Sequence, residues 1–182
     1  FCPGELVLGA RGTFYARRLD VEVNLTKECL IASAKHDGTS VTEIMQNCVI
    51  FNDKTHDIFA NKEWRADRTI ILRHGEPMIF GKNRDKGLVL EGLGLKVVTI
   101  GEGGWSIDDI LVHDAHQKNP GVHMMLVNMK APEFPVALGV IRDVEDHTYE
   151  DNVRKQVLDV QSKATIHSVD ELLHSGETWE IK

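Results

Sequence analysis

The sequence predicts an α/β fold that continues into an α+β region, and three observations support this fold class. The chain of 182 residues is 42% hydrophobic and 27% charged, which suffices for one globular domain or slightly more and excludes wholesale disorder. Up to residue 53, helical and strand-like patterns alternate. From residue 54 onward, short strand-like runs follow one another before further helical patterns appear.

The first region, residues 1–53, contains four expected elements. A helix is predicted over Pro3–Ala10 and a strand over Thr13–Ala16. A second helix, Asn24–His36, begins at a capping residue, and a second strand follows over Thr39–Gln46. Because a helix separates the two strands, they are expected to be parallel and to belong to a doubly wound sheet.

This first region is expected to be incomplete by itself. Parallel sheets need cover on both faces and more than two strands. The missing strands are therefore expected before Phe1, where the sequence starts without an initiator Met. Without those strands, we expect Phe14, Val41 and Ile44 to be exposed and the open strand edges to promote association.

The second region, residues 54–182, starts with a polar segment and then forms an α+β appendage. Its expected strands are an antiparallel meander of Arg68–Arg73, Met78–Phe80, Leu88–Leu90 and Leu95–Ile100, followed later by Ala137–Arg142. Its expected helical segments are Ser106–Asp109 (a helix or turn), Pro120–Met129, Tyr149–Gln161 and a tail that opens with the capping box Ser168–Glu171.

Charge and cysteine content exclude several classes of protein. A net charge of −7 and a pI near 5.7 argue against binding to nucleic acid or to an anionic membrane. The longest apolar runs are too short to cross a bilayer, so the sequence predicts a soluble protein. The three cysteines form neither a disulfide framework nor a zinc motif by their spacing, which favours the reducing cytoplasm.

Two clusters of polar or small residues have ordinary structural interpretations. His113 and His116 flank Asp114, but they lack a third metal ligand at a defined spacing. On a strand their side chains would face opposite ways, which favours a hydrogen-bonded structural or interface pair. The run Gly101–Gly104 lacks the frame of a phosphate-binding loop and is interpreted as a glycine-rich turn.

Cys48 stands out through its position alone. It follows the predicted parallel strand Thr39–Gln46, and loops at that edge of an open α/β sheet carry ligands and cofactors. A single cysteine is nevertheless more often a small buried apolar residue, which is the interpretation that composition and spacing favour. Cys29 lies among apolar residues in the middle of a predicted helix and is interpreted as a packing residue.

Several motifs in order along the chain give a resemblance to a known family. The segments that carry it are residues 8–17 (LGARGTFYAR), 35–44 (KHDGTSVTEI), 46–53 (QNCVIFND), 74–81 (HGEPMIFG), 111–114 (LVHD), 172–174 (LLH) and 178–179 (TW). Together they resemble the C-terminal portion of the β subunit of 2-oxoacid:ferredoxin oxidoreductases. The likeness is greatest to the 2-oxoglutarate type, in part because Gln46 and Asn47 precede the cysteine.

The resemblance implies an enzyme that oxidatively decarboxylates a 2-oxoacid to an acyl-CoA, as in the TCA cycle. In that family the β subunit holds thiamine diphosphate with Mg²⁺ and a [4Fe-4S] cluster, and electrons pass through the cluster to ferredoxin. Coenzyme A accepts the acyl group, and an α subunit completes the enzyme. Residues 1–53 would then be the C-terminal part of the thiamine-diphosphate-binding domain, and Cys48 matches the fourth cysteine ligand of the cluster.

The sequence also departs from the family pattern. The early C-x-x-C pair, the third cysteine ligand and the G-D-G motif for Mg²⁺ and diphosphate are absent. We therefore expect a portion that holds neither cofactor and is inactive alone. Two alternatives stay open: a non-catalytic assembly or interaction module derived from that subunit, and a pyruvate-specific relative.

Overall fold

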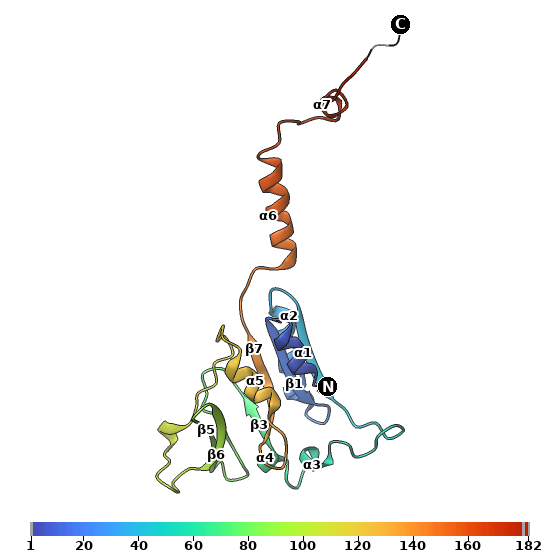
Figure 1. The fold of residues 1–182 in the computed structure, drawn as a ribbon. Helices are drawn as coiled ribbons and strands as arrows, with labels where there is room; N and C mark the ends of the chain where they lie inside the picture. The colour runs from blue at the N-terminus through green and yellow to red at the C-terminus, as the bar shows by residue number, and fades with distance from the viewer. Residues whose placement is uncertain (1, 180, 182) are drawn as a thin grey trace. The chain divides into compact units, whose positions relative to one another are not determined.

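The structure, a computed structural model, describes residues 2–179 and 181 and divides into two compact units, residues 1–146 and 147–182 (Figure 1). The first unit contains a mixed four-stranded sheet, a smaller antiparallel sheet and the helices packed on them. The described residues of the second unit form two helices. None of the helices among the described residues is long and apolar enough to span a membrane.

The four-stranded sheet has the order β2-β1-β7-β3. Its strands are β2 (Ser40–Met45), β1 (Phe14–Leu19), β7 (Val136–Asp143) and β3 (Thr69–Leu72). Strands β1 and β2 are parallel, as the sequence predicts. Strand β7 is antiparallel to β1 and parallel to β3, so the sheet is mixed and has α/β character without being purely parallel.

Strand β7 corrects the expectation that strands of the first region lack neighbours on this chain. Because β7 pairs with β1, β1 lies inside the sheet and all its residues are buried, Phe14 included. Val41 of β2 is half-buried, whereas Ile44 is exposed at the edge of the sheet, as expected. Strands from both sides of residue 53 therefore share one sheet.

A glycine allows the three strands β1, β7 and β3 to pack closely. Gly139 of β7 pairs with Arg17 on one side and with Leu72 on the other. Its φ of 115° lies in a region that favours glycine, and an added Cβ would lie 2.3 Å from the carbonyl oxygen of Leu72. The close approach of β3 to β7 therefore requires glycine at this position.

Helices cover both faces of this sheet (Figure 1). Helix α2 (Val23–Lys35) covers one face, where Cys29 packs against Phe14 and Ala16 of β1. Helices α1 (Pro3–Gly9) and α5 (Gly121–Asn128) cover the other face and share the main apolar core with Tyr15. Alternation of side chains along β1 sends Phe14, Ala16 and Arg18 towards α2 and sends Tyr15 and Arg17 to the opposite face.

The antiparallel sheet of the first unit has the order β4-β5-β6. Its strands β4 (Ile79–Phe80), β5 (Lys86–Glu91) and β6 (Gly94–Thr99) confirm the expected meander. The run Arg68–Arg73, expected as its first strand, instead supplies β3 of the larger sheet. A short apolar run identifies a strand but not its partner, which explains this difference.

The first unit also contains short helical segments, which are α3 (Asp57–Ala60), α4 (Arg65–Arg68) and η1 (Ile107–Asp109).

The second unit contains α6 (Tyr149–Gln161) and α7 (Val169–Leu173), as the sequence predicts. The side chain of Thr148 caps α6 by accepting a hydrogen bond from the backbone N–H of Asp151, at 3.1 Å. Ser168 caps α7 by accepting from the N–H of Glu171, also at 3.1 Å. Glu171 in turn accepts from the N–H of His167, so its carboxylate and the Ser168 hydroxyl satisfy two backbone donors at this helix start.

Candidate functional site

Cys48 lies in a tight turn just beyond the carboxyl end of β2. Cys48 and Asn52 form an antiparallel β-bridge, in which the N–H of Asn52 donates to the carbonyl of Cys48 at 2.9 Å. We call residues 46–53 the Cys48 loop. Its position beyond a parallel strand is the position that the sequence predicts for a ligand-carrying loop.

Side-chain hydrogen bonds hold the base of the Cys48 loop. The amide nitrogen of Asn47 donates to the carboxylate of Asp53 at 2.9 Å, and the amide oxygen of Asn47 accepts from the N–H of Lys54 at 2.7 Å. Lys54 has a φ of 59°, a conformation that few residues other than glycine adopt without such support. These contacts close the loop on itself and fix the direction of the turn that carries the cysteine.

The Cys48 thiol is exposed, which corrects the interpretation of this residue as a small buried side chain. Hydrogen bonds from backbone N–H groups lower the pKa of the thiol, with Phe51 contributing most, followed by Ile50 and Asn52. Donors that point at the sulfur favour the thiolate over the thiol. The thiolate is the nucleophilic and metal-binding form of cysteine, and the turn favours this form at Cys48.

Apolar side chains surround this thiol and are left in solvent. Val49, Ile50 and Phe51 are 74%, 82% and 90% exposed. Three consecutive exposed apolar residues are unusual in a surface turn, and patches of this kind mark contact sites. The Cys48 loop therefore combines an exposed thiol with an exposed apolar surface that is suited to contact.

A cross-strand ion pair anchors the strand that leads into this loop. Arg17 of β1 and Glu43 of β2 are paired in register, and Arg17 Nε donates to the Glu43 carboxylate at 2.7 Å. The Tyr15 hydroxyl donates to the same carboxylate. Burial of the hydroxyl and its bond to Glu43 raise the pKa of Tyr15, although Arg17 opposes this shift. We call these three residues the Tyr15–Arg17–Glu43 network, which the sequence motifs did not predict.

The structure gives the other two cysteines different surroundings. Cys29 is buried in the cluster with Phe14, which confirms its interpretation as a packing residue. Cys2 is half-buried, and its sulfur accepts a hydrogen bond from Arg17 Nη2 at 3.3 Å. Among the described residues, no group of three or more His, Cys, Asp or Glu side chains has an arrangement that could hold a metal ion.

The two candidate histidines lie in an irregular segment, which corrects their expected place on a strand. His113 is buried, its Nε2 bonds the carbonyl of Val140 at 2.9 Å, and burial lowers its pKa to about 4. His116 is exposed, contacts the carbonyl of Asp143 and packs its ring on His74 at a centroid distance of 4.2 Å. Their different hydrogen-bond partners agree with the structural interpretation of this pair.

The run Gly101–Gly104 forms turns, as the sequence predicts. Gly101, Gly103 and Gly104 have positive φ angles of 89°, 59° and 86°. These angles favour glycine and explain why the run is rich in it.

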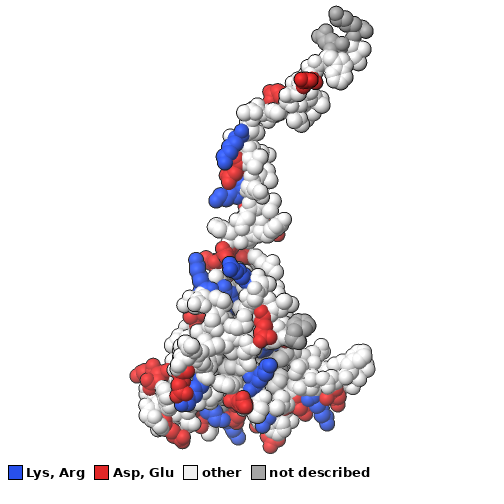
Figure 2. Space-filling model, in the orientation of Figure 1, with Lys and Arg blue, Asp and Glu red and all other residues white. Residues whose placement is uncertain are grey.

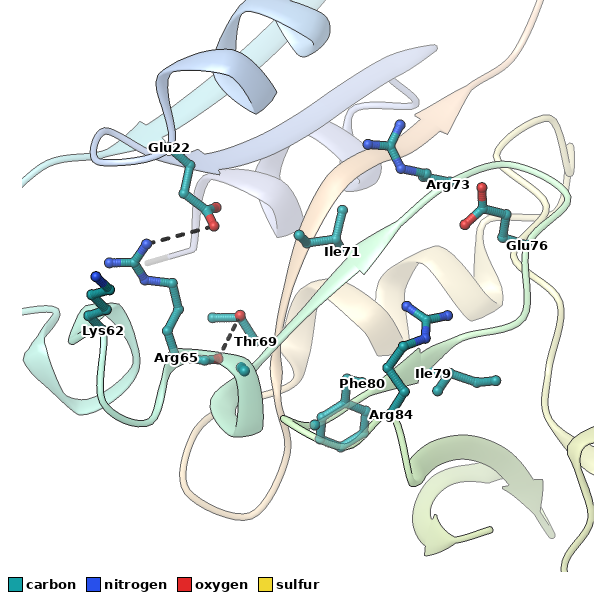
Figure 3. A pocket seen from close by; sticks show the side chains of 12 residues that line it. Glu22, Lys62, Arg65, Thr69, Ile71, Arg73, Glu76, Ile79, Phe80 and Arg84 are labelled. Carbon is teal, nitrogen blue, oxygen red and sulfur yellow. Dashed lines mark hydrogen bonds and ion pairs between the residues drawn. The ribbon is translucent and has the colours of Figure 1, made fainter.

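Sequence reasoning missed a surface pocket of about 420 Å³ beside β3 (Figure 3). Four cations surround it: Lys62, Arg65, Arg73 and Arg84. Figure 3 shows Arg65 extended towards Glu22, with their charged atoms 3.8 Å apart. The second carboxylate oxygen of Glu22 is buried without a hydrogen-bond partner. This unpaired acceptor disfavours an anion near it, so the surrounding cations do not define an anion site.

Comparison with known proteins identifies a relative over the whole chain. The 2-oxoglutarate oxidoreductase subunit KorB of Mycobacterium tuberculosis is 37% identical over 184 residues, which include 100% of this chain and 48% of that subunit. The chain thus spans about half the length of this relative. No family model matches the chain, and no solved structure matches it. The similarity confirms the resemblance that the sequence motifs predict: over its full length, the chain is similar to a C-terminal portion of a 2-oxoglutarate oxidoreductase β subunit.

Proposed function

We propose that this chain forms part of the β subunit of a cytoplasmic 2-oxoglutarate:ferredoxin oxidoreductase. The complete enzyme would convert a 2-oxoacid to the corresponding acyl-CoA, release CO₂ and transfer the two electrons to ferredoxin. Similarity over the entire chain to a subunit named for 2-oxoglutarate supports this choice above a pyruvate-specific relative. The α subunit, ferredoxin, the 2-oxoacid and coenzyme A are the partners that this proposal implies.

Within that enzyme we assign Cys48 as one ligand of a [4Fe-4S] cluster. The observation that carries this assignment is an exposed thiol at the carboxyl end of a parallel strand, with backbone donors that favour its thiolate. Iron–sulfur clusters are held by cysteine thiolates, and hydrogen bonds to sulfur tune their potentials. A bound cluster would supply one-electron transfer at this edge of the sheet.

The chain fits this cluster as the donor of one ligand. Cys29 is buried against β1, and the Cys2 sulfur accepts from Arg17, so both cysteines have structural roles away from the exposed turn. The remaining ligands would come from the portion of the subunit that this sequence does not contain. We assign no residue of this chain to thiamine diphosphate or Mg²⁺, because the sequence lacks the family's diphosphate motif.

The test replaces Cys48 in the complete subunit, assembled with its α partner. We expect Cys48→Ser to remove or alter the electron paramagnetic resonance signal of the reduced cluster, lower the iron content and stop reduction of ferredoxin by 2-oxoglutarate. The matched control is Cys2→Ser, since its hydroxyl still accepts from Arg17. This variant should retain both signal and activity.

Two results would contradict the proposal in different ways. Full iron content and unchanged ferredoxin reduction in Cys48→Ser would remove Cys48 from the ligand set. An unmodified complete protein that binds no iron and oxidises no 2-oxoacid would instead favour the non-catalytic assembly module.

A further inference from the structure

We propose that a cavity beside Arg18, on the α2 face of the four-stranded sheet, binds a small oxyanion through that guanidinium. The cavity measures about 260 Å³ and is lined by Arg18, Cys29, Arg73, His74, His116 and Asp143, among others. It has no role in the proposed function above, and this inference does not depend on that function.

The strongest observation is that Arg18 is buried without a counter-ion. Its exposed fraction is 2%, and its Nε donates to the sulfur of Cys29 at 3.1 Å. Its Nη1 is buried and has no hydrogen-bond partner. Within residues 2–179 and 181, no carboxylate forms an ion pair with it. A buried charge in this condition is costly unless a partner compensates it.

The two other buried arginines of the sheet show what a satisfied guanidinium looks like in this protein. Arg17 forms the ion pair with Glu43 at 2.7 Å. Arg142 donates to three backbone carbonyls, those of Gly12, Gln117 and Lys118, at 2.9–3.3 Å. Arg18 has no oxygen acceptor of either kind among the described residues, and it lines the cavity.

The acidic side chains of the cavity already have partners. Glu28 accepts from Arg73 at 3.2 Å, and Asp143 contacts His36 Nδ1 at 2.8 Å. Neither carboxylate forms an ion pair with Arg18. The Arg73 guanidinium and the neighbouring, tilted rings of His74 and His116 line the same space.

These features define the chemical class of the ligand. A guanidinium presents planar N–H donors that match the oxygens of carboxylate and phosphate groups, and such charge-assisted bonds are stronger than neutral ones. The cavity volume admits a small molecule only. We therefore assign it to a free oxyanion or a small metabolite that carries one.

The experiment measures thermal unfolding of the complete protein during titration with inorganic phosphate and, separately, with succinate, at constant ionic strength set with chloride. A ligand that binds the folded state raises the melting temperature in a saturable way. We expect saturable stabilisation by at least one of the two anions. The ratio of their dissociation constants then distinguishes a phosphate ligand from a carboxylate ligand.

Arg18→Met should weaken binding of that anion by at least about tenfold, because it removes a buried charge-assisted bond. The matched control is Arg84→Met, which removes the same charge from an exposed side chain that does not line the cavity. The dissociation constant of Arg84→Met for the anion should stay within about twofold of the value for the unmodified protein, since exposed charges are screened.

If Arg18→Met fails to fold, Arg73→Gln provides the second test at the exposed rim of the cavity, with weaker binding expected. The proposal is overturned if neither anion stabilises the unmodified protein beyond chloride. It is also overturned if Arg18→Met binds the anion with the same dissociation constant as the unmodified protein. Where Arg73→Gln is used as the substitute test, an unchanged dissociation constant in that variant overturns the proposal as well.

Discussion

The two units of this molecule differ in which side chains they bury. In residues 1–146, the arginines Arg17, Arg18 and Arg142 are buried within the sheet. In residues 147–182, apolar side chains such as Leu158 and Leu173 are exposed, and none of the described residues is buried. On the face in Figure 2, charged side chains are interspersed over the first unit and also lie along α6 and α7.

This difference shows which forces define each unit. In the first unit, pairing between distant strands fixes where each side chain lies, and buried arginines must find partners. In the second unit, caps at Thr148 and Ser168 define the helices without a packed core. Isolated helices of this length are marginal in water, because most helix stability comes from tertiary packing. The second unit should therefore be the less stable of the two.

The largest effect that we expect is at the Tyr15–Arg17–Glu43 network. Glu43→Ala leaves a buried guanidinium and a buried hydroxyl without their acceptor, and should lower the free energy of unfolding by about 3–5 kcal/mol. The control is Glu91→Ala, which removes the exposed pair with Lys96 at 2.6 Å. This change should cost less than about 1 kcal/mol. The free energy of unfolding of both variants would be measured by urea denaturation. If both substitutions lowered it equally, burial would not make the Glu43 network more stabilising than the exposed pair.

The next effect is a pH dependence confined to the first unit. Burial lowers the pKa of His113 from an ordinary value of 6.5 to about 4. Between these two values the unfolded chain binds more protons than the folded protein, so stability falls as the pH falls. Above pH 6.5 this histidine does not lower the free energy of unfolding. By pH 4, its protonation in the unfolded chain has lowered that free energy by about 3 kcal/mol.

Substitution of this histidine tests the assignment. His113→Gln keeps a donor for the carbonyl of Val140 and should flatten the dependence of unfolding free energy on pH in this window. The remaining slope would include His123, whose pKa burial also lowers. A slope as steep as that of the unmodified protein would assign the acid sensitivity to other groups.

Local sequence signals predicted much of this fold. The cap at Ser168, the turns at glycine and the strand patterns around β2 and the meander all depend on neighbouring residues, and the structure confirms them. The expected cap of the second helix at Asn24 is wrong, because α2 begins at Val23 and no side chain caps it. The parallel pairing of β1 and β2 followed from the intervening helix. Strand β7 could not be placed in the same way, because its pairing joins residues more than 100 positions apart, such as Phe14 and Asp143.

The candidate site was predictable in position but not in its chemistry. The motif around Cys48 located the residue at the end of a strand, yet the exposure of its thiol depends on how residues 48–52 turn back on themselves. The buried arginines were missed for a related reason. The expected strand ended at Ala16, whereas β1 continues through Arg17 and Arg18 to Leu19 between β2 and β7.

The smallest expected effect tests whether caps alone define the second unit. Ser168→Ala removes the acceptor for the N–H of Glu171 and should destabilise α7 by about 1 kcal/mol, which nuclear magnetic resonance shifts of residues 169–173 would report. The control is Ser162→Ala, at the C-terminal end of α6, where the Ser162 hydroxyl donates to the carbonyl of Asp159. This change should leave the shifts of residues 169–173 unchanged. In both variants the unfolding of residues 1–146 should be unaltered, since Ser168 and Ser162 are exposed and bury no apolar surface. A lower unfolding free energy of the first unit in Ser168→Ala would show instead that the stability of the two units is coupled.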